Sequence, residues 1–186
     1  MFLSRALFSL CACAMLVAPC AGFAQTIEAT PIPMAPPPNF SSMGFLVGTW
    51  SCSSKSSRRP AAYTSTSTYT ASADGWWLNE ITVTNPIPWY PYKVTTFDKI
   101  TYDASTMRWI DVMYGDYGSY GFSTSRGWVG DTMVWHDPTF AATSDVTSQT
   151  DVTVTMRSAT RMTSTSSFTE SSGRTVSVLT ICTKND

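Results

Sequence analysis

Short runs of alternating apolar and polar residues follow one another from Thr49 to the end of the chain. A period of two is typical of a β-strand with one buried face, and turn-forming segments such as 73–75 and 171–174 separate the runs. No run with a helical period exceeds two turns. The pattern predicts ten strands, at 49–58, 62–72, 76–85, 94–102, 107–114, 119–125, 128–136, 150–157, 161–169 and 175–183.

The alternation also indicates which face of a strand is buried. Val152 and Val154 share one face of 150–157, and we expect that face to point inward. Both faces of 107–114 are apolar, so the pattern does not assign its inside. In 76–85 we expect the apolar face to point inward and the polar face outward, with Trp77, Ile81 and Val83 inside and Glu80, Thr82 and Thr84 outside.

Ten strands joined by short turns predict an all-β fold, a single antiparallel up-and-down β-barrel. Successive connections of such a barrel lie at alternate ends. One end then holds the connections 59–61, 86–93, 115–118, 137–149 and 170–174. This end is expected to be open, because it includes both long loops, 86–93 and 137–149. The other end holds short turns and is the closed end, at 73–75, 103–106, 126–127 and 158–160.

The stretch from Gly44 to Cys52 begins the barrel. We expect the apolar turn Phe45–Val47 to form a short helical plug at the closed end. Gly48 permits close backbone approach, and Trp50 is large enough to fill the barrel floor.

Composition and charge exclude several classes of function. The chain has 186 residues, 43% hydrophobic and 13% charged, with a formal net charge of −1. A single core accommodates this length, and the balanced charge offers no basic surface for nucleic acid. Serine and threonine supply most of the polar positions, which again favours strands over helices.

The first 24 residues resemble a secretory signal peptide, with Arg5 before an apolar run and small residues before Gln25. We therefore expect an exported protein, periplasmic or secreted, with no transmembrane segment in the mature chain. Cys20 would accept a lipid anchor only in a lipoprotein signal, and Pro19 departs from that pattern.

The segment 25–40 is expected to be a proline-rich linker, and 41–186 the barrel domain. Five prolines between Pro31 and Pro38 favour an extended polyproline conformation. The linker is either a spacer or a binding segment for a protein partner.

Two cysteines remain after removal of the signal peptide, Cys52 and Cys182. In an oxidising compartment their expected state is a disulfide that joins the first strand to the last, and two buried free thiols are the alternative. A single histidine and the absence of a Cys-x-x-Cys motif argue against a metal site.

Gly48-Thr49-Trp50, Tyr102-Asp103 and the segment 127–132 carry a resemblance to a known superfamily. With ten antiparallel runs and a plug, the chain resembles the calycin superfamily of lipocalin-like barrels. It is most similar there to the ten-stranded nitrobindin-like proteins and to the bacterial domain of unknown function 1579 family. The resemblance implies a barrel with an interior cavity and no particular activity.

Nitrobindin-like barrels hold haem iron through a histidine on a late strand. The expected late strands here, 150–157 and 161–169, contain no histidine. We therefore expect no cofactor, because this departure argues against haem.

His136 is the one histidine, placed where the seventh strand reaches the open rim, and Asp137 follows it. A histidine serves as a base or a ligand, but adjacent strand residues point to opposite faces. Catalysis through His136 is therefore the weaker interpretation, and an ordinary rim histidine the stronger one.

Aromatic loops at the expected open rim are the main candidates for ligand binding. Trp89, Tyr90 and Tyr92 lie between prolines, and Tyr117 and Tyr120 lie among glycines across the rim. Such loops either cover a small apolar or aromatic ligand or fold onto their own barrel.

Arg108 and Asp111 lie in a strand whose other residues are apolar, so one of them is a candidate polar anchor inside the barrel. A charge on the outer wall is the alternative. The three glutamates are far apart in the sequence and form no evident catalytic pair.

No Gly-x-Ser-x-Gly or phosphate-binding loop is present. The sequence favours a non-enzymatic binding protein for a small, largely apolar ligand. The alternatives are an interaction module with a filled barrel and a weak hydrolase or isomerase that uses His136.

Overall fold

The computed structural model describes residues 38–59, 61–88, 91–140 and 146–185, with the side chains of all of these except 117, 137–140 and 146–148. The expected signal peptide, Cys20, most of the proline-rich linker, Trp89 and Tyr90 lie outside the described residues. Within the described ranges no helix is long and apolar enough to cross a membrane.

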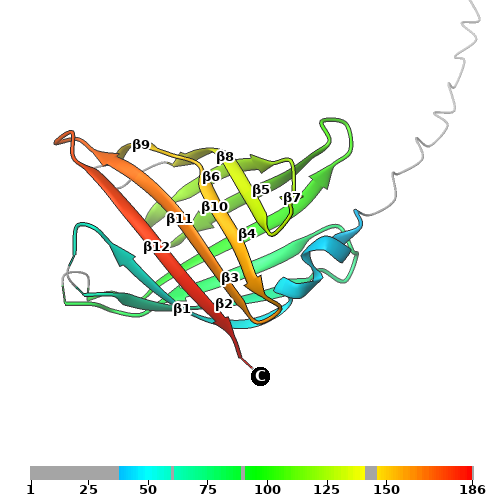
Figure 1. Ribbon diagram of the computed structural model, residues 1–186, viewed down its shortest axis with the longest axis horizontal. Coiled ribbons are helices and arrows are strands. Elements are labelled where there is room, and N and C mark those ends of the chain that lie inside the picture. Colours follow the sequence, from blue (N-terminus) through cyan, green and yellow to red (C-terminus); the bar gives the residue numbers. More distant parts are fainter. Residues whose placement is uncertain (1–37, 60, 89–90, 141–145, 186) are drawn as a thin grey trace, which may run out of the picture. The chain divides into compact units, whose positions relative to one another are not determined.

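Ten antiparallel strands close into a barrel, which confirms the predicted all-β fold (Figure 1). The strands follow one another in chain order, and closure comes from pairing of β8 with β10 and of β12 with β1. The barrel strands are β1 (Gly48–Ser56), β2 (Tyr63–Ala71), β3 (Leu78–Thr84), β4 (Val94–Asp103), β5 (Arg108–Gly115), β6 (Tyr120–Ser125), β8 (Thr132–Phe140), β10 (Val152–Ser158), β11 (Arg161–Glu170) and β12 (Thr175–Lys184).

The predicted strand 128–136 is divided in the structure. β7 (Trp128–Val129) turns at Gly130, whose positive φ of 64° suits a tight turn, and pairs with the start of β8. A second additional strand, β9 (Val146–Gln149), pairs with the upper part of β11. The other nine predicted strands match the observed ones to within a few residues.

The predicted inward face of 76–85 is wrong. Leu78 is buried and Glu80 lines the barrel interior, whereas Ile81 is 43% exposed on the outer wall. Since side chains alternate, a shift of one residue exchanges the two faces of a strand. The outer wall is itself apolar here, because Ile81 pairs with Phe97 and Phe97 stacks on Tyr114.

The structure also shows which faces of β10 and β5 point into the barrel. Val152 and Val154 line the interior, as predicted. In β5, which the pattern left unassigned, Asp111 and Met113 line the interior and Val112 is exposed at 38%.

A short 3-10 helix, η1 (Phe40–Leu46), lies at the closed end of the barrel (Figure 1). It begins earlier than the predicted plug because the side chain of Asn39 accepts a hydrogen bond from the Ser41 backbone. Trp50 is completely buried against it, and the indole Nε1–H donates to the Leu46 carbonyl at 2.7 Å.

The last strand, β12, contacts both η1 and Trp50 through Lys184. Lys184 Nζ donates to the Phe45 carbonyl at 2.8 Å and lies 5.6 Å from the centre of the Trp50 ring. Gly48 has a φ of +126°, and a Cβ there would lie 2.8 Å from the Lys184 side chain. Glycine is therefore required where the chain leaves the helix for β1.

Cys52 and Cys182 form a disulfide, as predicted. The two residues are direct partners in the ladder between β1 and β12, and both are buried. The bond therefore joins the first and last strands of the barrel.

Replacement of Trp50 by alanine should lower the free energy of unfolding by about 3 to 5 kcal/mol, the usual cost of removing a large buried aromatic side chain. Denaturant unfolding measures this loss. Val129→Ala, at a site of the same barrel end that is 80% exposed, is the control and should leave the midpoint unchanged. Equal midpoints for Trp50→Ala and the wild type would contradict the floor role of Trp50.

The disulfide closes a loop with a sequence separation of 130 residues. By chain-entropy arithmetic its removal should cost on the order of 4 to 5 kcal/mol. Cys52→Ser and Cys182→Ser should therefore lose similar stability, and protein from an oxidising compartment should show no free thiol after denaturation. The control is Ser54→Ala with Thr180→Ala, the neighbouring inward pair, which should cost only about 1 kcal/mol.

Candidate functional site

A cavity of about 400 Å³ lies inside the barrel above the buried floor. Met43 and Leu46 of η1 close its lower end. Its lining extends to Tyr63, where β2 begins, and to Thr84, where β3 ends. Both residues lie at the end of the barrel opposite η1, so the cavity reaches from the floor toward the open rim.

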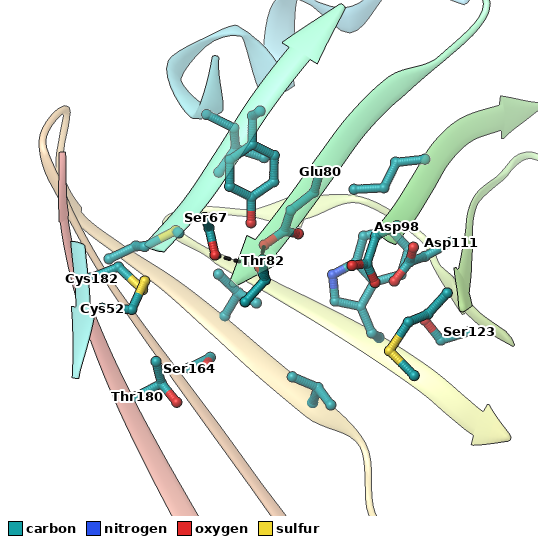
Figure 2. A pocket seen from close by; sticks show the side chains of 18 of the residues that line it. Cys52, Ser67, Glu80, Thr82, Asp98, Asp111, Ser123, Ser164, Thr180 and Cys182 are labelled. Atoms are coloured by element: carbon teal, nitrogen blue, oxygen red, sulfur yellow. Dashed lines mark hydrogen bonds between the residues drawn. A yellow bond between two sulfur atoms is a disulfide. The ribbon is translucent and has the colours of Figure 1, made fainter. Parts of the chain in front are cut away.

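The two sides of the cavity differ in chemistry (Figure 2). One side carries apolar groups from β10 and β11, among them Val152, Val154 and Met162, together with the Cys52–Cys182 disulfide and the hydroxyl groups of Ser164 and Thr180. The opposite side carries carboxyl groups from three consecutive strands, Glu80 on β3, Asp98 on β4 and Asp111 on β5.

Strand register brings the three carboxyl groups together. Glu80 is the direct cross-strand partner of Asp98. Asp98 pairs with Met113, so Asp111, two residues before Met113, is its diagonal neighbour on the same face. Directly opposite residues have Cβ atoms about 4.5 to 5.5 Å apart, and diagonal neighbours are within reach of longer side chains.

Among these three carboxyl groups, Glu80 has the most hydrogen bonds. Thr82 Oγ1 donates to Glu80 Oε1 at 2.8 Å. The Ser67 hydroxyl lies 2.6 Å from Thr82 Oγ1 and also binds the Glu80 carboxyl group. The hydroxyl of Tyr69, the cross-strand partner of Glu80, also binds this carboxyl group. Burial raises the pKa of Glu80, and these hydrogen bonds oppose the rise.

The pKa values of the two aspartates are also raised. Burial, and then the charges of Glu80 and Asp111, raise the pKa of Asp98 to about 9. Burial and the Glu80 charge raise the pKa of Asp111 to about 7, against a hydrogen bond from Ser123. Near neutral pH, both aspartates therefore favour the protonated form more than an exposed aspartate does.

The described residues that line the cavity include no lysine, arginine or histidine. Two buried polar atoms of this lining have no hydrogen-bond partner, the acceptor Asp111 Oδ1 and the donor Trp128 Nε1. Over the described ranges, no three His, Cys, Asp or Glu residues are placed to hold a metal ion. The arrangement can bind a group that supplies hydrogen-bond donors or positive charge.

The rim residues proposed from the sequence do not line this cavity where the structure describes them. Tyr92 and Tyr120 are 56% and 55% exposed. Tyr117 belongs to the short helix η2 (Asp116–Gly118), and its side chain lies outside the described atoms. Arg108 donates to Thr124 Oγ1 at 3.2 Å and is not part of the cavity lining.

His136 lies on β8 beside the cavity-lining Trp135, but its own side chain is not part of the lining. His136 Nδ1 is 2.8 Å from Asp151 Oδ2, so its described carboxylate partner is Asp151. Both side chains are more than a third exposed, which places the pair on the outer side of the wall.

Sequence reasoning named Asp111 but missed Glu80 and Asp98. It considered the three glutamates, which are far apart along the chain, and did not consider Asp98. The signal was present in the turns, since hairpins centred on 73–75, 86–93 and 103–106 pair Tyr69 with Glu80, Glu80 with Asp98, and Asp98 with Met113. Applying that register would have placed all three acids on one face.

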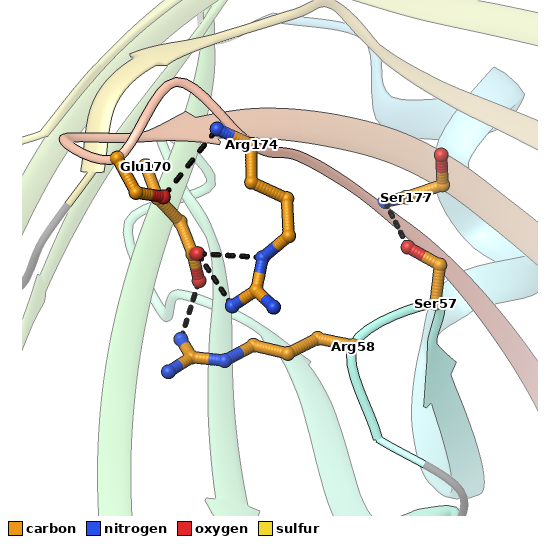
Figure 3. Close-up of polar contacts among 6 residues, drawn as sticks. Ser57, Arg58, Glu170, Arg174 and Ser177 are labelled. Atoms are coloured by element: carbon orange, nitrogen blue, oxygen red, sulfur yellow. Dashed lines mark hydrogen bonds and ion pairs between the residues drawn. The ribbon is translucent and has the colours of Figure 1, made fainter.

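Glu170 is a buried carboxylate of a different kind (Figure 3). Arg58, from the β1–β2 connection, and Arg174, from the β11–β12 hairpin, both bind it. Arg174 Nε and Nη2 donate to Glu170 Oε2 at 2.9 and 2.6 Å. This cluster joins two hairpins at the open rim, and the Glu170 carboxylate is paired with two guanidinium groups.

Comparison with known proteins gives distant structural similarity alone. No family model matches the chain, and no curated protein matches it. A solved structure of a protein of unknown function from the DUF3598 family of Nostoc punctiforme aligns with 85% of the chain at 14% identity and a TM-score of 0.41. The alignment covers 53% of that protein, so the chain spans about half its length. Similarity at this level assigns neither a family nor a function.

Asp98→Asn tests the protonation of the cluster. The pKa of Asp98 rises from its ordinary 3.8 to about 9 on folding, so unfolding releases its proton across that window and stability falls as pH rises through it. Asparagine does not titrate. The stability of Asp98→Asn relative to the wild type should therefore increase from pH 5 to pH 9, by at most about 1.4 kcal/mol per pH unit.

Denaturant unfolding at pH 5, 7 and 9 measures this difference. Asp131→Asn, which removes an exposed carboxylate at the β7–β8 turn, is the control and should show no such trend. A difference that stays constant with pH would mean that Asp98 is ionised in the folded protein.

Proposed function

We propose that this chain is an exported, non-enzymatic binding protein that holds a small molecule inside its barrel. The observation that carries the proposal is the cavity of about 400 Å³ within a closed wall of ten strands. Small-molecule sites in proteins usually occupy about 300 to 1,000 Å³ and combine an apolar lining with a few polar groups.

The lining indicates an amphipathic ligand. Val152, Val154 and Met162 offer contact for an apolar body, and the hydroxyl and carboxyl groups of β2 to β5 face a polar end. We therefore expect a ligand that carries a polar group in addition to the largely apolar body inferred from the sequence. The ligand would enter at the rim formed by the start of β2 and the end of β3, since the cavity lining reaches Tyr63 and Thr84 there.

Membership of the calycin superfamily, close to the domain of unknown function 1579 family, is part of this proposal. Ten antiparallel strands, the helix η1 beneath them and the buried Trp50 support it. Export to the periplasm or the medium is supported by the signal-like first 24 residues and by the disulfide.

The alternatives have less support. An interaction module needs a barrel filled by its own side chains, and the cavity argues against this. Catalysis by His136 requires a carboxylate or hydroxyl within hydrogen-bond reach of its ring. Asp151 Oδ2 meets this requirement, at 2.8 Å from His136 Nδ1. The pair lies outside the cavity lining, however, so it has no evident substrate pocket.

Adjacent residues of β10 provide a matched test. Val154 lines the cavity, whereas Thr155 is not among its lining residues and points to the other face. Val154→Trp should fill the cavity and weaken binding of the neutral fluorescent probe N-phenyl-1-naphthylamine at least tenfold. Thr155→Trp should leave the affinity within about twofold.

Thermal unfolding of both variants checks that each is folded, and native mass spectrometry of protein from its own host checks for a co-purified molecule. Equal probe binding by the two variants would place the probe outside the barrel. Absence of binding by the wild type across neutral and charged probes would refute the function.

A further inference from the structure

The acidic side of the cavity lacks a protein counter-ion. Glu80, Asp98 and Asp111 project from three neighbouring strands, and no described lining residue is basic. Buried carboxylates that face each other either keep protons or bind a cation, because their charges repel and water is excluded. The buried carboxylate of Glu170 differs, because two arginines of the protein neutralise it.

A second observation comes from hydrogen bonding. Asp111 Oδ1 and Trp128 Nε1 have essentially no exposed surface and no partner, although more than about nine in ten buried polar groups in proteins are paired. Both residues line the cavity, and Figure 2 shows the Asp111 side chain directed into it, near Asp98. The barrel therefore holds an unpaired acceptor on Asp111, near Asp98, and an unpaired donor on Trp128.

The neighbouring groups limit what can occupy this position. Glu80 already accepts from Thr82 and Tyr69, so the acceptors left open belong mainly to Asp98 and Asp111. An ammonium group carries three donors and one positive charge, which matches two or three converging carboxyl groups. On the facing side, Val152, Val154 and Met162 offer apolar contact for a hydrocarbon chain or ring attached to it, beside the hydroxyl groups of Ser164 and Thr180.

We propose that the cavity binds an organic cation, an amphipathic amine whose ammonium group lies between Asp98, Asp111 and Glu80 and whose apolar part contacts β10 and β11. This inference rests on the proposed binding function and names its class of ligand.

Binding of such a cation must displace protons. The groups that face the ammonium position are Glu80, Asp98, Asp111 and the hydroxyl of Tyr69, and their pKa values are all raised in the empty protein, first of all by burial. A positive charge lowers the pKa of each neighbouring carboxyl group. Amine binding near pH 7 therefore releases protons, and affinity falls as the solution is acidified.

Calorimetry with 4-phenylbutylamine and its neutral analogue 4-phenylbutanol tests the inference. At pH 7.5 the amine should bind at least tenfold more tightly than the alcohol. Its heat of binding should change with the ionisation enthalpy of the buffer, which reports proton release, and the heat for the alcohol should not. Asp111→Asn should weaken the amine about tenfold or more and change the alcohol less than threefold.

Two further variants complete the design. Asp98→Asn is a second test of the cluster and should also weaken the amine selectively, even if Asp111→Asn does not fold. Asp131→Asn removes the same charge from an exposed turn and should leave both affinities unchanged.

The outcomes separate this inference from the proposed function. Binding of the alcohol as tightly as the amine, or equal losses in Asp111→Asn and Asp131→Asn, would overturn the cation and leave the cavity as a binding site. Failure of the amine, the alcohol and N-phenyl-1-naphthylamine alike would overturn both.

Discussion

Pairing of β1 with β12 is the interaction on which the rest of the structure depends. It joins the two ends of the barrel sequence, and without it the sheet would be an open ladder with two free edges. Cys52 and Cys182 are direct partners in this ladder, and their bond reduces the entropy cost of bringing such distant segments together. Closure also creates an inside, so each inward side chain meets those of strands across the barrel.

The inside is filled at one end only. Large side chains occupy the closed end, where Trp50, Trp109 and Met133 are buried beside η1. Higher in the barrel the inward positions of β1, β2 and β6 carry mainly small residues, such as Ser65, Gly121 and Ser123. Interiors are normally close-packed, so a row of small residues facing inward leaves the volume that forms the cavity.

The buried carboxyl groups at the rim and in the cavity differ in whether a cation of the protein neutralises them. Glu170 at the rim is held by Arg58 and Arg174, and it connects hairpins that are distant in sequence. In the cavity, Glu80 and Asp111 have hydroxyl partners, and no described lining residue is basic. The pKa values of Asp98 and Asp111 rise to about 9 and about 7. Burial of carboxyl groups without a cation costs stability, and such costs concentrate at functional sites.

The sequence by itself determined nine of the ten strand runs, the helix beneath Trp50 and the cysteine pair, because these depend on local patterns and on which residues are available to pair. It did not show the turn at Gly130 or the additional strand β9. It did not determine which face of β3 points inward, since Ile81 and Glu80 alternate on a strand whose outer wall is also apolar. That choice came from the register of neighbouring hairpins, in which Leu78 is buried opposite Ile100. Only the closed barrel could place Glu80, Asp98 and Asp111 around one cavity, because a shift of a single residue would have turned any of them to solvent.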